Sequence, residues 1–182
     1  LEDLEREEAR DLGLRVFVGR RQASVSASDL SAATQARLVE RAVAMARLAP
    51  EDPYADLAPD DRLARGPLPD LDLYDPSEPS AETMERRSAE AEAAALAVTG
   101  VARSEGGHAA WSSSRWRLVT SHGFDGAYQG SAFSLGVGVI AEKDGAMERG
   151  GESRSTRHLS DLPGAEAIGR TAGERAAARV GA

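Results

Sequence analysis

The sequence contains no cysteine, few aromatic residues and no long apolar run, and each of these absences excludes a class of protein. Without cysteine, the chain can form neither disulfide bonds nor thiolate metal sites. Aromatic residues make up 4% of the 182 residues, so we expect a core of closely packed small side chains, mainly alanine. No stretch approaches the roughly 18 apolar residues that a membrane-spanning helix needs, so we expect no membrane contact.

The chain also lacks an excess of positive charge. Its net charge is −8 and its pI is near 5.0, which argues against a direct nucleic-acid partner because phosphate binding requires a basic face. No signal-peptide pattern is visible, and this favours the cytoplasm. The length predicts a single domain over residues 1–182.

The first third of the chain predicts a β-hairpin followed by a helix. Apolar and polar residues alternate over 12–18 and again over 23–28, which is typical of half-buried strands, and "GRRQ" (19–22) suits the turn between them. Ser31 is a good N-cap for a helix over about 31–48, and Pro50 ends it.

From Pro50 to Pro79 the chain is rich in proline and aspartate and predicts no regular structure. Such a long segment is either an excursion along the surface or a mobile connection. Ser80 then caps a second predicted helix over 81–97, where alanine-rich sequence lets another element approach closely.

Residues 98–158 have the pattern of an antiparallel meander of four strands, and a helix over about 165–179 follows. The predicted class is therefore α+β: a β-hairpin, two helices and a β-meander, with a mostly antiparallel sheet flanked by helices.

The strand over 133–140 has two different faces. Phe133, Leu135, Val137 and Val139 point to one side, and small residues point to the other. Glycine weakens a strand interior, so its use here indicates that another backbone comes close. That neighbour is either a peptide or partner strand, or a closely packed helix. The small residues, which we take as candidate contacts, are Ser134, Gly136 and Gly138.

The stretch "TSHGFDG" (120–126) places a serine beside a histidine and before an aspartate. Neighbours in a strand point to opposite faces, so Ser121 and His122 could not meet as nucleophile and base if both are extended. The glycines favour the turn of a hairpin instead. His122 is kept as a candidate contact with a peptide or partner.

The remaining candidate groups do not form a catalytic or metal-binding set. His108, His122 and His158 have none of the spacings of a zinc motif, so no metal site, no cofactor site and no catalytic residue is predicted. "SEGG" (104–107) has no lysine where a phosphate-binding loop needs one, and a bulge explains its glycines better. Glu105 could act as a general base and is kept as a candidate contact.

Several stretches together resemble one known family. They include "SVSASDLS" (24–31), "LPDLDLYDPSEPSAE" (68–82), "SEGGHAAW" (104–111), "AYQGSAFSLGVGVIAE" (127–142) and "RHLSDL" (157–162). In this order they resemble the N-terminal domain of the TldD/PmbA family, historically called modulators of DNA gyrase, and most closely its PmbA (TldE) branch.

The resemblance implies a subunit of a bacterial cytoplasmic metallopeptidase that degrades unfolded peptides or trims peptide precursors. In that family a TldD-type subunit holds zinc through a His-Glu-x-x-x-His motif and pairs with a PmbA-type subunit that lacks it. The expected partners are thus a TldD-like paralogue in a heterodimer, or a second copy, and unfolded peptides. No residue here matches the zinc motif, and the family's C-terminal domain is expected to be absent from these residues. The alternative is a non-catalytic interaction module acting on DNA gyrase.

Overall fold

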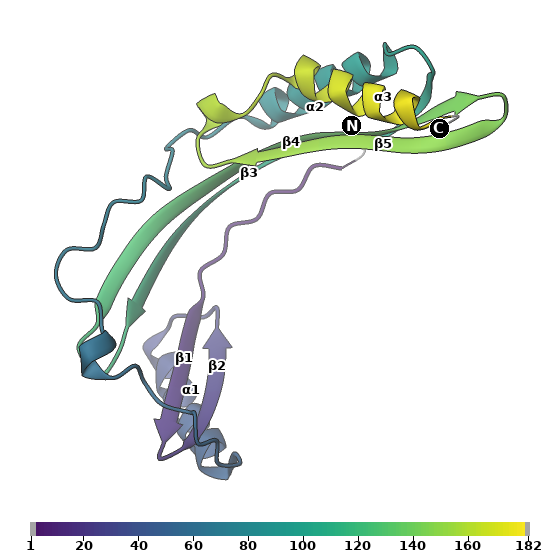
Figure 1. The fold of residues 1–182 in the computed structure, drawn as a ribbon. Coiled ribbons are helices and arrows are strands. Elements are labelled where there is room, and N and C mark those ends of the chain that lie inside the picture. The colour runs from purple at the N-terminus through teal and green to yellow at the C-terminus, as the bar shows by residue number, and fades with distance from the viewer. Residues whose placement is uncertain (1–2, 181–182) are drawn as a thin grey trace. The chain divides into compact units, whose positions relative to one another are not determined.

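The computed structural model describes residues 3–180, and its contacts gather into two compact units, residues 3–65 and the residues from Gly66 on (Figure 1). The sequence prediction treated residues 1–182 as one domain. The division falls between Arg65 and Gly66, inside the proline- and aspartate-rich segment, whose described residues form no strand and only one short 3-10 turn, Asp60–Arg62.

The amino-terminal unit contains an antiparallel hairpin and one helix. Strands β1 (Leu12–Val18) and β2 (Arg21–Ala27) pair from Leu12 opposite Ala27 to Val18 opposite Arg21. Gly19 takes a φ of +59° in the turn, a conformation that glycine adopts without strain. The turn is therefore shorter than the predicted residues 19–22, and β2 begins two residues earlier than expected.

Helix α1 (Ala32–Leu48) packs on this hairpin. Its N-cap is Ser31, as predicted, whose side chain accepts a hydrogen bond from the Thr34 amide and so satisfies one of the free donors of the first turn. Its buried residues recur at helical spacing and form one face: Leu38, Ala42 and Ala46.

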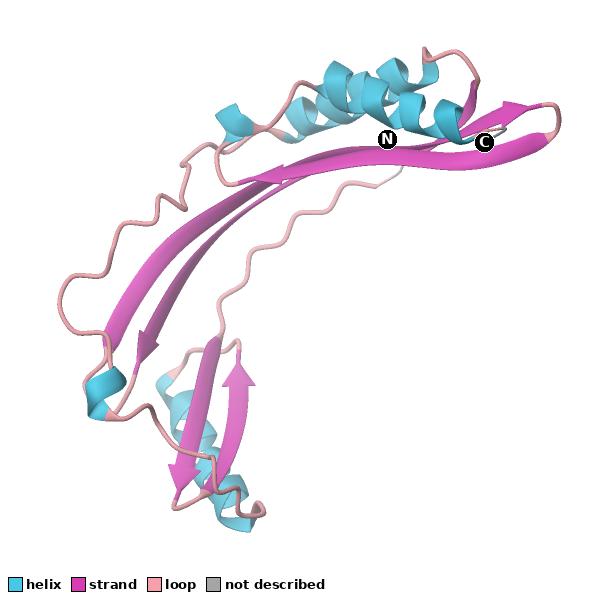
Figure 2. Cartoon of the chain, in the orientation of Figure 1, coloured by secondary structure: helices cyan, strands magenta, loops and turns pink. Residues whose placement is uncertain are grey.

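The carboxyl-terminal unit is a three-stranded antiparallel sheet with helices on one face, in the strand order β3-β4-β5. Figure 2 shows the helices along this face of the long strands. Its elements are α2 (Ala81–Leu96), β3 (Val101–Val119), β4 (Asp125–Lys143), β5 (Ala146–Thr156), a 3-10 turn (Leu159–Asp161) and α3 (Ala165–Arg179). The predicted α+β class with antiparallel sheets is confirmed.

The prediction of four strands over 98–158 was wrong by one. Two of the four expected strands are one continuous strand, because β3 stays paired with β4 from Trp111 opposite Phe133 to Val119 opposite Asp125. Ser112, Ser113 and Ser114 are therefore part of β3 because they pair with β4. Their polar side chains do not show the alternation that predicts a strand.

The core lies between the helices and the face of β4 that the sequence predicted. Phe133, Leu135 and Val139 are fully buried there, and Val137 is nearly so. Small residues of α2 and α3 complete the cluster, among them Ala91, Ala95, Ala172 and Ala176. Among the described residues, no helix has the length and apolar character needed to cross a membrane.

Helices α2 and α3 approach each other through glycines. A Cβ at Gly169 would overlap the carbonyl oxygen of Ala91, and a Cβ at Gly173 would lie 2.8 Å from the carbonyl oxygen of Ala95. Both distances are shorter than van der Waals contact allows, so the two helices can pack at this separation only without side chains at these positions.

Candidate functional site

The face of the sheet that carries no helix brings together four of the five predicted contact residues. Ser134, Gly136 and Gly138 alternate on β4 with the buried core residues. The Glu105 side chain reaches over Gly138, 3.7 Å from the place a Cβ would take there. We call this surface the open face.

On the open face, the two glycines of β4 give room to side chains of the neighbouring strands. A Cβ at Gly136 would overlap the imidazole ring of His108, its cross-strand partner on β3, and would lie 2.9 Å from the Cβ of Ser153 on β5. At Gly138, Glu105 from β3 and Arg149 from β5 meet in an ion pair of 2.7 Å. The space that suggested a second backbone is thus partly occupied by His108 and by this ion pair.

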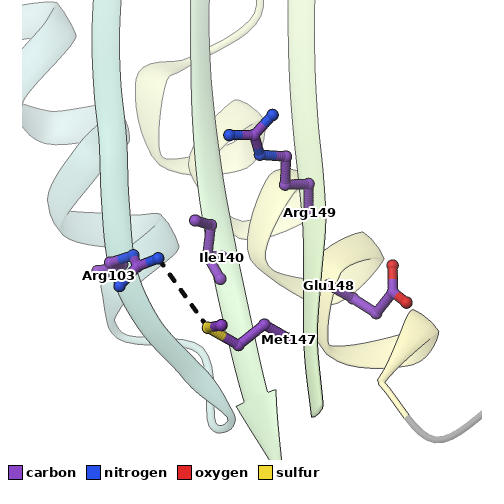
Figure 3. A pocket seen from close by; sticks show the side chains of 5 residues that line it. All are labelled: Arg103, Ile140, Met147, Glu148 and Arg149. Carbon is purple, nitrogen blue, oxygen red and sulfur yellow. Dashed lines mark hydrogen bonds between the residues drawn. The ribbon is translucent and has the colours of Figure 1, made fainter.

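The Glu105–Arg149 ion pair stands beside a shallow pocket of about 390 Å³ (Figure 3). Two of its lining residues are apolar, Ile140 and Met147, and the Met147 sulfur lies 4.0 Å from the Arg103 guanidinium. The other three are charged: Arg103, Glu148 and Arg149. A pocket with this lining can accept an apolar side chain next to an acidic or carbonyl group.

The two edge strands of the sheet differ in how their backbones are bonded. On β5, the carbonyl of Arg149 accepts a hydrogen bond of 2.7 Å from Arg179, and that of Gly151 accepts one of 3.3 Å from Arg175. Both arginines belong to α3. In the described part of the chain, no backbone group of β3 from Ala102 to Leu118 is hydrogen-bonded to any element outside the β3–β4 hairpin.

Arg175 also pairs with Glu152, a buried carboxylate on β5 that sequence reasoning did not single out. Glu152 is 6% exposed, and Arg154 lies 2.6 Å from its other oxygen. A buried charge is stable only when it is paired, so this cluster holds α3 on the sheet. Its signal in the sequence was a lone glutamate on the inward side of a glycine-rich strand.

His122, the fifth predicted contact residue, lies away from the open face. It sits exposed in the turn between β3 and β4, with Ser121 and Gly123. This turn is closed by hydrogen bonds from the Thr120 amide to the Phe124 carbonyl and from the Gly123 amide to the Thr120 carbonyl. The hairpin interpretation of "TSHGFDG" is therefore confirmed.

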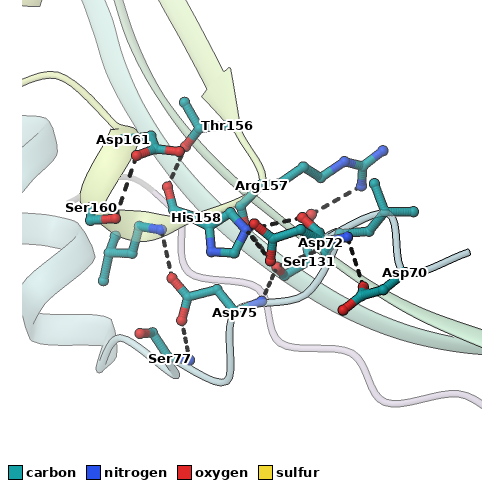
Figure 4. Close-up of polar contacts among 12 residues, drawn as sticks. Asp70, Asp72, Asp75, Ser77, Ser131, Thr156, Arg157, His158, Ser160 and Asp161 are labelled. Carbon is teal, nitrogen blue, oxygen red and sulfur yellow. Dashed lines mark hydrogen bonds and ion pairs between the residues drawn. The ribbon is translucent and has the colours of Figure 1, made fainter.

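A polar network fastens the segment before α2 to the end of β5 (Figure 4). Its centre is Ser131, 2% exposed, whose hydroxyl accepts from the Asp75 amide at 2.9 Å and donates to the Arg157 carbonyl at 2.7 Å. The carboxylate of Asp75 accepts from the amides of Ser77 and Leu159. The pKa of Asp75 is lowered, first by the Ser77 side chain and then by these two amides. The second half of the predicted excursion thus runs along the surface.

His158 closes this network at Asp72. Its Nε2 lies 3.0 Å from the Asp72 carbonyl oxygen and 3.3 Å from the carboxylate of the same residue. The bond to that carbonyl raises the pKa of His158 above its ordinary 6.5, and the charges of Asp72, Asp161 and Asp75 act in the same direction against desolvation.

The His158 contact should make stability depend on pH. Because the pKa of His158 is higher in the folded state than its unfolded value of 6.5, the contact stabilises the fold fully below pH 6.5. This stabilisation is lost as the pH rises through the folded-state pKa. We expect the melting temperature of His158→Gln to lie below that of the wild type by no more than about 3 °C at low pH, because the contact is near the surface. The gap should shrink by pH 9, as thermal melts can measure.

The matched control is His122→Gln, in the exposed turn, which should leave the melting temperature unchanged at every pH. A gap for His158→Gln that widens with rising pH would contradict the assignment.

The histidines and acidic residues that the structure describes do not fit a metal site. His108, His122 and His158 lie on β3, in the turn and after β5 respectively. Among residues 3–180, no group of three or more His, Asp or Glu side chains could hold a metal ion. No catalytic step through a metal is therefore derived from these residues.

The comparisons with known proteins agree with the fold and with each other. Residues 1–46 match the description "PmbA/TldA metallopeptidase domain 1", and residues 74–180 match "PmbA/TldA metallopeptidase central domain". The chain is 36% identical to the Metalloprotease PmbA of Escherichia coli O157:H7 over 170 residues, and 30% identical over 172 residues to a Metalloprotease PmbA homolog of Haemophilus influenzae. Each alignment covers 93% of this chain but 38% of the relative.

Solved structures show the same fold. A protein from Bacteroides thetaiotaomicron described as a modulator of DNA gyrase superposes with a TM-score of 0.82 at 22% identity, over 91% of this chain and 38% of that one. TldE from Thermococcus kodakarensis superposes with a TM-score of 0.69 at 19% identity, over 89% of this chain and 36% of that one. Since one of the matched family domains covers more than half of the chain, the chain belongs to the PmbA/TldD metallopeptidase family.

Proposed function

We propose that this chain is the peptide- and subunit-binding part of a PmbA/TldE-type subunit in a bacterial cytoplasmic metallopeptidase. It would bind unfolded peptides for degradation or trimming and pair with a TldD-like subunit, which supplies the zinc. The two metalloprotease relatives support the peptidase assignment, and the chain spans 38% of their length.

The observation that carries the proposal is the difference between the two sheet edges. An extended peptide that adds to an edge strand is recognised through its backbone, which suits a protein that must accept many sequences. On strand β3, the backbone from Ala102 to Leu118 has no hydrogen bond to any described element outside the β3–β4 hairpin. On β5, by contrast, two carbonyls are already occupied by Arg175 and Arg179.

The bulge of β3 adds side-chain contacts beside this edge. The pairing register shifts between Ser104 and Gly106, and Gly106 has a φ of +106°, which favours glycine. Glu105 stands in this bulge, next to the pocket lined by Arg103 and Arg149. A peptide along β3 would therefore meet one shallow pocket that is lined by Ile140, Met147 and three charged side chains.

Hydrogen exchange with an unstructured peptide tests this proposal. Addition of the peptide should slow amide exchange in β3 over residues 101–119 and leave β5, over residues 146–156, unchanged. The control is the same peptide N-methylated at every residue, because it keeps the side chains and loses its backbone donors along both edges. We expect it to give no protection.

Protection of β5 instead of β3, or equal protection by the methylated peptide, would contradict the edge assignment. We also expect the chain alone to hold no stoichiometric zinc and to leave a denatured peptide uncut. If metal analysis found one tightly held zinc per chain, the proposal that the TldD-like subunit supplies the zinc would be wrong.

A further inference from the structure

Ile140 is a large apolar residue on the open face, and it is only 7% exposed. No helix covers this face, so the side chains of the neighbouring strands must cover it. Its cross-strand partners are Arg103 on β3 and Arg149 on β5, in one row across the sheet. Adjacent strands lie about 4.8 Å apart, so the two arginines start roughly 10 Å from each other with Ile140 between them. Their apolar stems can rest on Ile140 while the charged ends stay in water.

The two guanidinium groups of this row have hydrogen-bond donors to spare. In the described part of the chain, Arg103 forms no ion pair, and its guanidinium contacts the Met147 sulfur at 4.0 Å, which is a weak acceptor. Arg149 binds Glu105 through one nitrogen at 2.7 Å, and its side chain is 78% exposed. Each guanidinium has five N–H donors, so both can bind an anion that enters the pocket.

The carboxylates near the pocket leave this positive charge in place. Glu148 lines the pocket, but it pairs with the buried core residue Ala141, and its carboxylate points away from the other four lining side chains (Figure 3). On the open face, Glu105 is already ion-paired. Glu142 lies opposite Met147 and is not part of the lining. In a chain that carries −8 overall, this pocket therefore favours an anion.

The size and the apolar part of the pocket narrow the choice of anion. Its volume of about 390 Å³ is near the lower end of the roughly 300–1,000 Å³ of ligand pockets, which suits a single residue better than a large cofactor. A carboxylate matches the planar fork of a guanidinium, and Ile140 and Met147 can contact an apolar group beside it. The C-terminal residue of a peptide carries both groups on one carbon atom when its side chain is apolar.

We propose that this pocket binds the C-terminal residue of a peptide. The carboxylate accepts hydrogen bonds from Arg103 and Arg149, and an apolar side chain packs on Ile140 and Met147. This inference deepens the proposed function, and its choice of a peptide as ligand rests on it. Strand β3 would bind peptide backbones of any sequence, whereas the pocket would favour chains with a free, apolar C-terminal end, such as fragments that have already been cut.

Methyl NMR of the methionines tests the pocket directly, because only one of the three methionines, Met45, Met84 and Met147, lines it. N-acetyl-leucine is the probe, since it is a C-terminal residue too short to add to β3 as a strand. It should shift the Met147 methyl signal alone, with a dissociation constant on the order of 1–10 mM. N-acetyl-leucinamide, which lacks the carboxylate, should bind at least about tenfold more weakly. Met147→Leu assigns the signal.

Arg103→Gln should raise the dissociation constant for N-acetyl-leucine at least about tenfold. The side chain is exposed, so the variant should fold. The matched control is Arg86→Gln on α2, whose side chain is 60% exposed and pairs with Glu90, and it should bind the probe as the wild type does. Equal binding of the acid and the amide, or wild-type affinity in Arg103→Gln, would overturn the proposal. The comparison of acid with amide needs no variant.

Three unstructured peptides separate the sources of the carboxylate. The first ends in leucine with a free carboxylate, the second is its C-terminal amide, and the third is an amide with an internal glutamate beside a leucine. Only the first should shift the Met147 methyl signal. An equal shift with the third peptide would show that a side-chain carboxylate enters the pocket, and the C-terminal assignment would be wrong.

The same experiments distinguish this inference from the proposed function. If the acid and the amide protect β3 equally from hydrogen exchange and neither shifts the Met147 signal, strand addition holds and the pocket proposal fails. If N-acetyl-leucine shifts Met147 as expected but no peptide protects β3, the pocket proposal is supported and the edge assignment is wrong.

Discussion

Replacing Gly169 by leucine is expected to force α2 away from α3 and to lower the melting temperature of the carboxyl-terminal unit strongly. Even a Cβ at this position would overlap the Ala91 carbonyl and lie 2.9 Å from the Cβ of Ala94. The obstructing oxygen belongs to the backbone, so a rotamer change cannot relieve the overlap. Overpacking commonly costs about 1–3 kcal/mol and at times more; we expect at least about 3 kcal/mol, or roughly 6–12 °C.

The change at Gly169 is compared with Ala167→Leu, which adds a larger side chain to the exposed side of the same helix. This control should melt close to the wild type, because leucine is nearly as good a helix former as alanine. Circular dichroism melts and urea titrations measure both variants. Equal melting temperatures for Gly169→Leu and the wild type would show that the helices do not need this close approach.

Replacing Phe133 by alanine is the second change with a large expected effect. Phe133 is fully buried and is the largest of the fully buried side chains, and it belongs to one core cluster with Leu162 and the small residues of α3. Truncation of a buried phenylalanine costs about 3–5 kcal/mol through lost transfer energy and the cavity left behind. Neighbouring alanines are too short to fill that cavity, so we expect the upper part of this range.

Urea unfolding of Phe133→Ala should show the loss as a lower midpoint with little change in slope. Tyr54→Ala serves as the comparison, because this tyrosine is almost wholly exposed and its removal should change the free energy of unfolding by less than about 0.5 kcal/mol. A similar effect of both changes would mean that Phe133 is not central to the core.

Elements governed by local chemistry could be predicted well from the sequence. Ser31 and Ser80 are the N-caps of α1 and α2, as predicted. The side chain of each accepts a hydrogen bond from the amide three residues later. The alternation of Phe133 and Leu135 with small residues identified the buried face of β4 correctly. Both signals lie within a few residues of the positions that they determine.

Features that depend on partners distant in the sequence were missed or only half understood. The sequence analysis interpreted Gly136 as a place where a second backbone or a helix comes close. In the structure, the ring of His108 fills that space, and His108 lies 28 positions earlier in the sequence. The partner of His158 was not predicted, since Asp72 is 86 residues away in the sequence. No local pattern predicts such pairs, because strand register and loop path determine them.

The arginines of α3 on the backbone of β5 have a further consequence for how the protein behaves when it is concentrated. A sheet with two free edges can propagate by adding strands on both sides, which is the geometry of fibril growth. With the carbonyls of Arg149 and Gly151 occupied by Arg179 and Arg175, this sheet is closed to extension on one side. Strand addition is therefore directed to the β3 side, and the sheet can be extended at that one edge only.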